Sequence, residues 1–282
     1  MRARAPASSA NLGPGFDALA VALALYVEVT VEPADRLCVS SEGEGAELPA
    51  DASHLAARVA VQVAGHDRLA ITVRSQIPVG RGLGSSAALA VATAAAAGAT
   101  DPLAVGARVD GHPENAAASS LGGLVAATVV DGVAAAERLP LDPHLAFVVV
   151  VPDRQLATKQ ARAVLPSSVP HADAGFNLGR MGLLIAGLAD HRRLRPAATE
   201  DRLHQPYRSP LFPESEQLLV GLVDAGALAT SWSGAGPSIL AICTAGTASR
   251  VAEAGAKLLA ATGLTGLVLQ LAPDYEGVKT TA

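Results

Sequence analysis

Residues 78–88 read Pro-Val-Gly-Arg-Gly-Leu-Gly-Ser-Ser-Ala-Ala, and this glycine-rich stretch decides the fold of the 282-residue chain. Alternating apolar residues predict a strand over 69–75 before it, and an alanine-rich run predicts a helix over 85–97 after it. Glycines let a backbone approach an anion closely, and a helix start offers unpaired N–H groups and a favourable dipole. A Ser at the helix start can also cap such groups. The stretch therefore predicts a loop that suits a triphosphate.

The loop differs from two other phosphate-binding patterns. A Walker A loop carries a Lys directly before its hydroxyl residue, and no Lys precedes Ser85 and Ser86. A dinucleotide-binding fingerprint places its third glycine elsewhere and needs an acidic residue after a second strand. Three alternating glycines alone also fit an ordinary flexible turn, so this alternative stays open at the level of the loop.

Composition limits the classes of protein that fit. Half of the residues are apolar and only 3% are aromatic, which predicts a compact globule with a core of Ala, Val and Leu. The net charge of −5 and the lack of a basic run argue against a nucleic-acid partner. The apolar stretch 18–27 is too short to span a bilayer, so we expect a cytoplasmic protein with no membrane partner. Cys38 and Cys243 lie in apolar runs and are expected to be buried and reduced.

The order of the elements predicts an α+β protein. Further strands are expected over 25–31, 124–130, 145–151, 227–232, 238–243 and 266–271, and further helices over 52–64, 112–120, 158–165, 174–191, 214–224 and 248–262. The continuous apolar run at 147–151 predicts a central strand that opens a second domain. We therefore expect two domains, over residues 1–145 and 146–282.

Read in full, residues 78–88 resemble the phosphate loop of the GHMP kinases. Two more segments are similar to motifs of that superfamily and stand in the same order: 6–17 (PASSANLGPGFD) and 233–238 (SGAGPS). Either could be an ordinary turn alone, but all three together are hard to explain as coincidence. Segments similar to those of the homoserine kinase family are 110–115 (DGHPEN), 158–162 (TKQAR) and 201–208 (DRLHQPYR). The likeness runs over nearly the whole chain.

The resemblance implies the GHMP kinase fold. Residues 1–145 would form a nucleotide-binding domain like domain 2 of ribosomal protein S5, and 146–282 a ferredoxin-like α/β plait, with the active site between them. The resemblance also implies ATP and Mg²⁺ as cofactors, L-homoserine as the substrate, and a homodimer. The expected reaction is attack of the homoserine hydroxyl on the γ-phosphate of ATP, which gives O-phospho-L-homoserine for threonine biosynthesis.

The resemblance also nominates the residues of the site. A zwitterionic substrate needs a planar guanidinium for its carboxylate and an acid for its ammonium group. The substrate is expected to contact Asn11, Asp17, His112, Asn115, Arg162, Arg208 and Gly234, and catalysis is expected to involve Asp17, Asn115 and Thr158. Asp17 is expected to anchor the substrate rather than to abstract a proton. ATP is expected to contact Pro78, Val79, Gly80, Arg81, Gly82, Leu83, Gly84, Ser85, Ser86, Ala87 and Ala88.

One departure from the family concerns magnesium. Family members commonly place a magnesium-binding Glu eight residues before the His of the matched segment, and here that position is Ala104. Ser86 with the phosphates, or a nearby acid such as Asp110 or Asp101, is then expected to hold the ion; otherwise the metal site is degraded. Residues 49–55 are expected to contact the adenine.

Three rival functions remain open. The chain could be a GHMP kinase for another small alcohol, although Asp17 and the two Arg segments fit an amino acid better. It could be a catalytically weak relative that binds a nucleotide or metabolite, for which Ala104 is the main support. An interaction protein without a site is disfavoured by the three phosphate-type loops.

Overall fold

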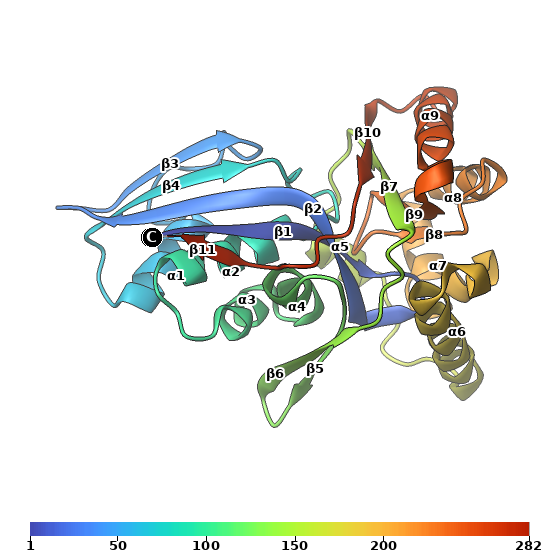
Figure 1. Cartoon of the computed structure of the whole chain (residues 1–282), viewed down its shortest axis with the longest axis horizontal. Coiled ribbons are helices and arrows are strands. Elements are labelled where there is room, and N and C mark those ends of the chain that lie inside the picture. The colour runs from blue at the N-terminus through green and yellow to red at the C-terminus, as the bar shows by residue number, and fades with distance from the viewer. Residues whose placement is uncertain (282) are drawn as a thin grey trace.

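The computed structural model describes residues 1–281 and contains two β-sheets, each covered by helices (Figure 1). The first sheet has seven strands. They are β1 (Arg2–Asn11), β2 (Gly15–Pro33), β3 (Cys38–Gly43), β4 (Leu69–Ser75), β5 (Leu124–Val130), β6 (Val133–Leu139) and β11 (Lys279–Thr281). Their order is β11-β1-β2-β4-β3, and β5 pairs with both β2 and β6. The long strand β2 therefore organises this half of the molecule.

Four helices pack together on one side of the first sheet (Figure 1). They are α1 (Leu55–Ala64), α2 (Ser85–Ala96), α3 (Pro102–Asp110) and α4 (Glu114–Leu121). Helix α2 contacts β1, β2 and the other three helices, and seven of its twelve residues are buried alanines. The small side chains permit close approach: a Cβ at Gly106 of α3 would lie 2.7 Å from Val91 Cγ2 of α2. The alanine-rich composition thus reflects tight packing around the central helix.

The second sheet has the order β10-β7-β9-β8, and all its pairs are antiparallel. Its strands are β7 (Leu145–Pro152), β8 (Ala229–Trp232), β9 (Ile239–Thr244) and β10 (Gly266–Leu271). Numbered along the chain, this order is fourth, first, third, second, which is the ferredoxin-like arrangement. The expected fold class is therefore confirmed for this half.

Helices follow β7 and β9 in the second half. The structure contains α5 (Thr158–Ala163), α6 (His171–Ala189), α7 (Gln205–Arg208), α8 (Ser215–Asp224) and α9 (Ala245–Ala261), with 3-10 turns at His191–Arg193, Pro196–Thr199 and Ser209–Leu211. Helices α8 and α9 pack on each other and on this sheet. Within residues 1–281, no helix combines the length and apolar character that a bilayer crossing requires.

The end of the chain returns to the first sheet. After β10, the chain runs back beside β1, where β11 pairs antiparallel with its start and aligns Thr281 with Arg2 (Figure 1). The two sheets are thus connected twice, once before β7 and once after β10. The division at residue 145 stays a prediction, and β11 belongs by its pairing to the N-terminal sheet.

Some helices and strands of the structure match the expected ranges closely, and others were not expected from the sequence. The strands over 69–75, 124–130 and 266–271 have the expected bounds. Strand β1 was not expected, because its segment Ala7–Asn11 is buried without alternation. Cys243 is buried, which raises the pKa of its thiol to about 12. The expectation that Cys38 is buried is wrong: this residue begins the strand β3, which lies at the edge of the sheet, and is exposed.

Candidate active site

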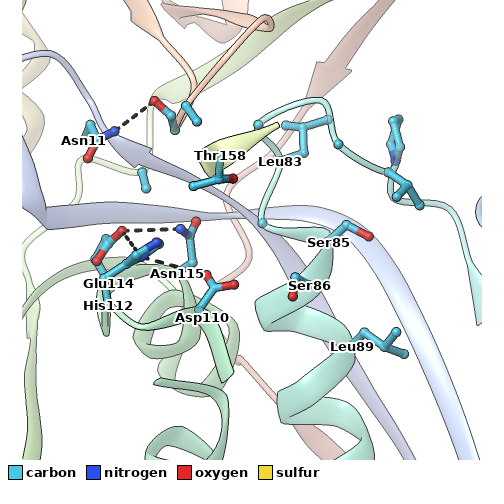
Figure 2. Close-up of a pocket in the computed structure, with 18 of the residues that line it drawn as sticks. Asn11, Leu83, Ser85, Ser86, Leu89, Asp110, His112, Glu114, Asn115 and Thr158 are labelled. Carbon is cyan, nitrogen blue, oxygen red and sulfur yellow. Dashed lines mark hydrogen bonds and ion pairs between the residues drawn. The ribbon is translucent and has the colours of Figure 1, made fainter. Parts of the chain in front are cut away.

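A pocket of about 390 Å³ lies where the three glycine-containing motifs meet. This volume is within the usual range for a small-molecule site. Residues nominated from the sequence that line it are Asn11, Asp17, Pro78, Val79, Gly80, Gly82, Leu83, Gly84, Ser85, Ser86, His112, Asn115, Thr158, Arg162, Arg208 and Gly234. Figure 2 shows Asn11, Thr158 and Leu83 on one side of the space, with Ser86, Asp110 and Asn115 on the other.

Hydrogen bonds hold the three motifs together behind the pocket. Ser233 Oγ donates to the Gly82 carbonyl at 2.6 Å and lies 2.8 Å from Ser9 Oγ. The main-chain N–H of Gly234 donates to the Ala10 carbonyl at 3.0 Å. A single buried hydroxyl, Ser233, therefore joins segments that lie more than 220 residues apart in the chain.

The glycine loop needs its glycines for both conformation and space. Gly80, Gly82 and Gly84 have φ values of +69°, +78° and +65°, in the left-handed region that side chains disfavour. A Cβ at Gly82 would lie 2.2 Å from the Ser233 carbonyl oxygen, and one at Gly84 would lie 2.1 Å from Ser8 Oγ. Larger residues would force the three motifs apart.

The start of helix α2 faces the pocket without a side-chain cap. Gly84 is the N-cap residue, and no side-chain oxygen accepts from the first turn. The expectation that a Ser caps this helix is therefore wrong, because both Ser85 and Ser86 lie inside the helix, where they line the pocket. The uncapped N–H groups and the helix dipole together make an anion site.

Three residues nominated for ATP do not line the pocket. Arg81 turns away and donates to the Pro152 carbonyl at 2.6 Å and to Asp153 at 2.7 Å. Ala87 and Ala88 are fully buried in the core under the loop. These three residues therefore support the loop on the sides that face away from the pocket.

Asp17 and Arg162 form a two-pronged ion pair at the opposite end of the pocket. The guanidinium nitrogens lie 2.7 and 3.0 Å from the two carboxylate oxygens. The hydrogen bond to Asp17 raises the pKa of Arg162. Asp17 has a φ of +54° and its main-chain N–H donates to Asn11 Oδ1 at 3.0 Å, so the motif at 6–17 orients this carboxylate.

Arg208 lies beside this pair but is almost fully buried. It is 1% exposed, and its Nη1 donates to the Gly234 carbonyl at 3.2 Å while its Nε donates to the Ala161 carbonyl at 3.2 Å. Burial, with a contribution from neighbouring Arg162, lowers the pKa of Arg208 to about 10. The side chain is fixed in place, and it still lines the pocket.

His204 supports this region and was not nominated from the sequence. Its Nε2 lies 2.8 Å from the Gly13 carbonyl, and its Nδ1 lies 3.0 Å from Arg208 Nη1. Burial lowers the pKa of His204 to about 4, so the ring is neutral, donates from Nε2 and accepts at Nδ1. The ring also stacks on Phe16, with centroids 5.2 Å apart. The sequence signal that could have identified His204 is its position four residues before Arg208, which places the two side chains on the same face of one helical turn.

Asp201 and Asn177 hold the turn that carries His204. Asp201 accepts main-chain N–H groups from residues 203, 204 and 205, at 2.9, 2.9 and 2.6 Å. Asn177 of α6 donates to Asp201 at 2.7 Å. The start of α7 is therefore capped by a buried carboxylate.

Asp110, His112 and Glu114 gather beneath the phosphate loop (Figure 2). His112 Nδ1 lies 2.8 Å from Glu114 Oε1 and 3.9 Å from Asp110. Burial acts to lower the pKa of His112, but Glu114 and Asp110 outweigh it and raise the pKa. Burial also raises the pKa of Asp110, and the adjacent Ser86 hydroxyl opposes this shift. Glu114 is 1% exposed, and its Oε2 has no hydrogen-bond partner within residues 1–281.

The structure separates the two acids considered for magnesium. Asp110 lines the pocket, whereas Asp101 caps helix α3 by accepting the Ala104 N–H at 2.9 Å. Ala104 lines a different groove, with Val129 and Val133 of the β5–β6 hairpin. The pocket itself contains an acid at Asp110.

An apolar end of the pocket lies beyond the loop. Leu48, His54, Leu55, Val79 and Leu89 line it. His54 and Leu55 belong to the 49–55 stretch expected at the adenine, while residues 49–53 do not line the pocket.

Comparison with known proteins first identifies the class of protein to which the chain belongs. Residues 52–123 match the sequence model described as the GHMP kinases N terminal domain, and residues 183–261 match the one described as GHMP kinases C terminal. The chain is 43% identical to a homoserine kinase of Streptomyces coelicolor, covering 89% of this chain and 87% of that one. It is 41% identical to a homoserine kinase of Rhodococcus erythropolis, covering 99% and 96%. The chain thus belongs to the homoserine kinase family of the GHMP kinases.

Solved structures agree with this family. A homoserine kinase from Cytophaga hutchinsonii superposes with a TM-score of 0.86 at 28% identity, covering 99% of this chain and 96% of that one. A mevalonate kinase from L. major superposes with a TM-score of 0.69 at 16% identity, covering 96% of both chains. The second likeness shows the fold alone.

Proposed function

We propose that the protein phosphorylates the hydroxyl group of L-homoserine with ATP, giving O-phospho-L-homoserine for threonine biosynthesis. One observation carries this proposal: a single pocket joins an uncapped helix start to a charged group of Asp17, Arg162 and Arg208. The first feature suits a triphosphate and the second a zwitterion. Membership of the homoserine kinase family supports the same substrate pair.

The charged end of the pocket matches the two charges of an amino acid. The ammonium group is proposed to contact Asp17, and the carboxylate to contact Arg162 and Arg208. Since Asp17 and Arg162 neutralise each other without ligand, a zwitterion could exchange partners with both and leave no unpaired charge. A ligand with only one charge would leave one member of the pair uncompensated. Asn11, His112 and Gly234 are proposed to line the same subsite.

The residues around Ser86 fit a magnesium ion. Asp110 faces this hydroxyl, and the buried Glu114 Oε2 has no hydrogen-bond partner among the described residues, so oxygen ligands of the kind Mg²⁺ prefers are present. We propose Ser86 and Asp110 as ligands, with ATP phosphates completing the site. Bound there, Mg²⁺ would neutralise the charge of the phosphate groups. The glycine loop itself is proposed to hold ATP by main-chain N–H groups.

The remaining residues are proposed to position the hydroxyl. Phosphoryl transfer needs alignment and charge neutralisation more than a strong base. Asn115 is held by Ser8, whose hydroxyl lies 2.9 Å from Asn115 Oδ1, and Thr158 begins helix α5 at the pocket. We assign both to orienting the hydroxyl and the transferred phosphate, while Asp17 anchors the substrate.

A coupled ADP-release assay tests the function. L-homoserine with Mg²⁺ and ATP should give steady turnover, whereas mevalonate and galactose should give only the background rate. No turnover of homoserine would sink the proposal, and preferred turnover of mevalonate would indicate another small-alcohol kinase. A catalytically weak relative stays the second candidate, supported by Ala104 at the usual Glu position, and homoserine turnover near the background rate would indicate it. The homodimer stays a prediction, which sedimentation equilibrium would check.

A further inference from the structure

A second cluster of ligand-type side chains lies outside the pocket. Asp142 and His144 precede β7, and His191 follows α6. His144 Nδ1 lies 2.9 Å from one carboxylate oxygen of Asp142, and His191 Nδ1 lies 2.6 Å from the other. The three ligand atoms lie within 4.8 Å of one another, and none of these residues lines the pocket.

The carboxylate at the centre is held by the main chain. Asp142 is 8% exposed, and its two oxygens accept the N–H groups of His144 and His191, both at 2.9 Å. Its own N–H donates to the Leu188 carbonyl at 2.8 Å. These bonds orient the carboxylate as outer-shell partners orient the ligands of a metal site. Because these main-chain N–H groups already donate to the Asp142 carboxylate, neither imidazole ring has to donate a proton to it.

The spacing and access suit a metal ion. Ligand bonds of 2.0–2.2 Å at the tetrahedral angle of Zn²⁺ place neighbouring ligand atoms about 3.4 Å apart. The two imidazole nitrogens lie 2.6 and 2.9 Å from the carboxylate here, so a small rotation of each ring would make room for the ion. His144 has a side-chain exposure of 75% and His191 one of 26%, so an ion can enter and keep water ligands. Arg192 is next to His191 in sequence, and its positive charge is already paired with Asp190, with 2.8 Å between the nitrogen and the carboxylate oxygen.

We propose that Asp142, His144 and His191 form a binding site for a divalent cation such as Zn²⁺ or Co²⁺. Two imidazole nitrogens and one carboxylate favour these ions, whereas Mg²⁺ prefers oxygen ligands. The bound ion joins the segment before β7 to the end of α6, which are 49 residues apart in sequence. It acts as a structural clasp, because no residue of the cluster reaches the pocket.

Titration calorimetry with Zn²⁺ in excess Mg²⁺ tests the site, since Mg²⁺ should compete with Zn²⁺ for the oxygen ligands proposed in the ATP pocket. The whole chain should bind one equivalent, and Zn²⁺ should raise its melting temperature. His144→Ala and His191→Ala should each weaken Zn²⁺ binding by more than the roughly 10- to 100-fold that loss of an outer-shell partner costs. His66→Ala, at an exposed His elsewhere, is the matched control and should bind as the parent does.

Two results would overturn the site. One is an absence of stoichiometric Zn²⁺ binding to the parent chain. The other is equal Zn²⁺ binding by the parent and both variants, which would leave the cluster only a hydrogen-bonding role. His144 is exposed, so His144→Ala is expected to fold normally, and the Co²⁺ absorption spectrum of the parent and this variant gives a second readout that is independent of stability.

Discussion

Two regions of the pocket, the phosphate loop and the charged end, present charge by different means. At the phosphate loop, Gly82, Gly84 and the uncapped start of α2 present main-chain N–H groups, and the nearest Arg faces away. At the other end, Asp17, Arg162 and Arg208 present charged side chains. The comparison shows that one end depends on backbone shape and the other on individual charges. Substitutions should therefore affect the two ends in different ways.

Gly82→Ala should have the largest effect. Its Cβ would lie 2.2 Å from the Ser233 carbonyl oxygen, so the loop or its partner must move. Displacements near 1 Å can cost about 100-fold in rate, and we expect kcat/KM to fall by at least about that factor for ATP and for homoserine. Steady-state kinetics with each substrate varied in turn would measure it.

Gly132→Ala is the matched control for backbone strain. Its φ is +79°, against +78° at Gly82, but nothing lies within 4 Å of the added Cβ. Activity should remain near that of the parent. If both variants lost activity alike, contact between the motifs would not be the cause.

Arg162→Met should have the next largest effect and act on one substrate only. A hydrogen bond to a charged group contributes about 1.5–3 kcal/mol, so KM for homoserine should rise roughly 10- to 100-fold. KM for ATP should stay nearly unchanged, because the phosphate loop is untouched. Arg208 is less suitable for this test, since its burial makes a folding defect harder to separate.

Arg74→Met provides the control for loss of an ion pair. Arg74 pairs with Glu42 at 2.9 Å, but both side chains are more than half exposed and neither lines the pocket. Both KM values should match the parent. Equal increases in KM for ATP and homoserine in Arg162→Met would show that the residue shapes the whole pocket.

His204→Phe should have a smaller kinetic effect through Arg208. The neutral ring accepts from Arg208 Nη1 and donates to the Gly13 carbonyl, and Phe keeps the stacking but neither bond. Loss of positioning worth about 1.5 kcal/mol would raise KM for homoserine by roughly 10-fold with kcat little changed. His204→Gln, which can both donate and accept, should recover part of the loss. No recovery, with KM for ATP raised equally, would indicate a general packing role.

The smallest effect concerns stability against acid. Because the folded pKa of His204 is lowered to about 4 from 6.5, the unfolded chain takes up a proton first as pH falls. Stability from this group is complete above pH 6.5 and is lost as pH falls towards 4, at about 1 kcal/mol per pH unit. Urea unfolding measured between pH 7 and 5 should show that the free energy of unfolding falls less steeply with decreasing pH in His204→Gln than in the parent. An identical pH dependence in the two proteins would contradict the neutral buried ring.

Local patterns in the chain were sufficient for much of the fold. Strands such as 69–75 and 124–130 alternate clearly, and the glycine loop is recognisable because its glycines must adopt positive φ. Helix α3 was missed, although Asp101 and Pro102 form a normal helix start. Strand β1 was missed because its residues 7–11 are all buried, so this part of the strand lacks the alternation of a half-exposed strand. Resemblance supplied the ferredoxin-like arrangement, which no single segment encodes.

The sequence by itself determined the phosphate loop, the family and the set of residues near the pocket. Only the tertiary structure decided how these residues act together. It turned Arg81 outward, left α2 uncapped, brought Asp110 to Ser86 and buried His204 against Arg208. The physical reason is that motif identity is local, whereas direction, burial and charge pairing depend on neighbours that only the folded chain brings together, such as the Gly13 carbonyl that lies 191 residues from His204. The same rule applies to Asp142, whose two His partners come together only in the folded chain.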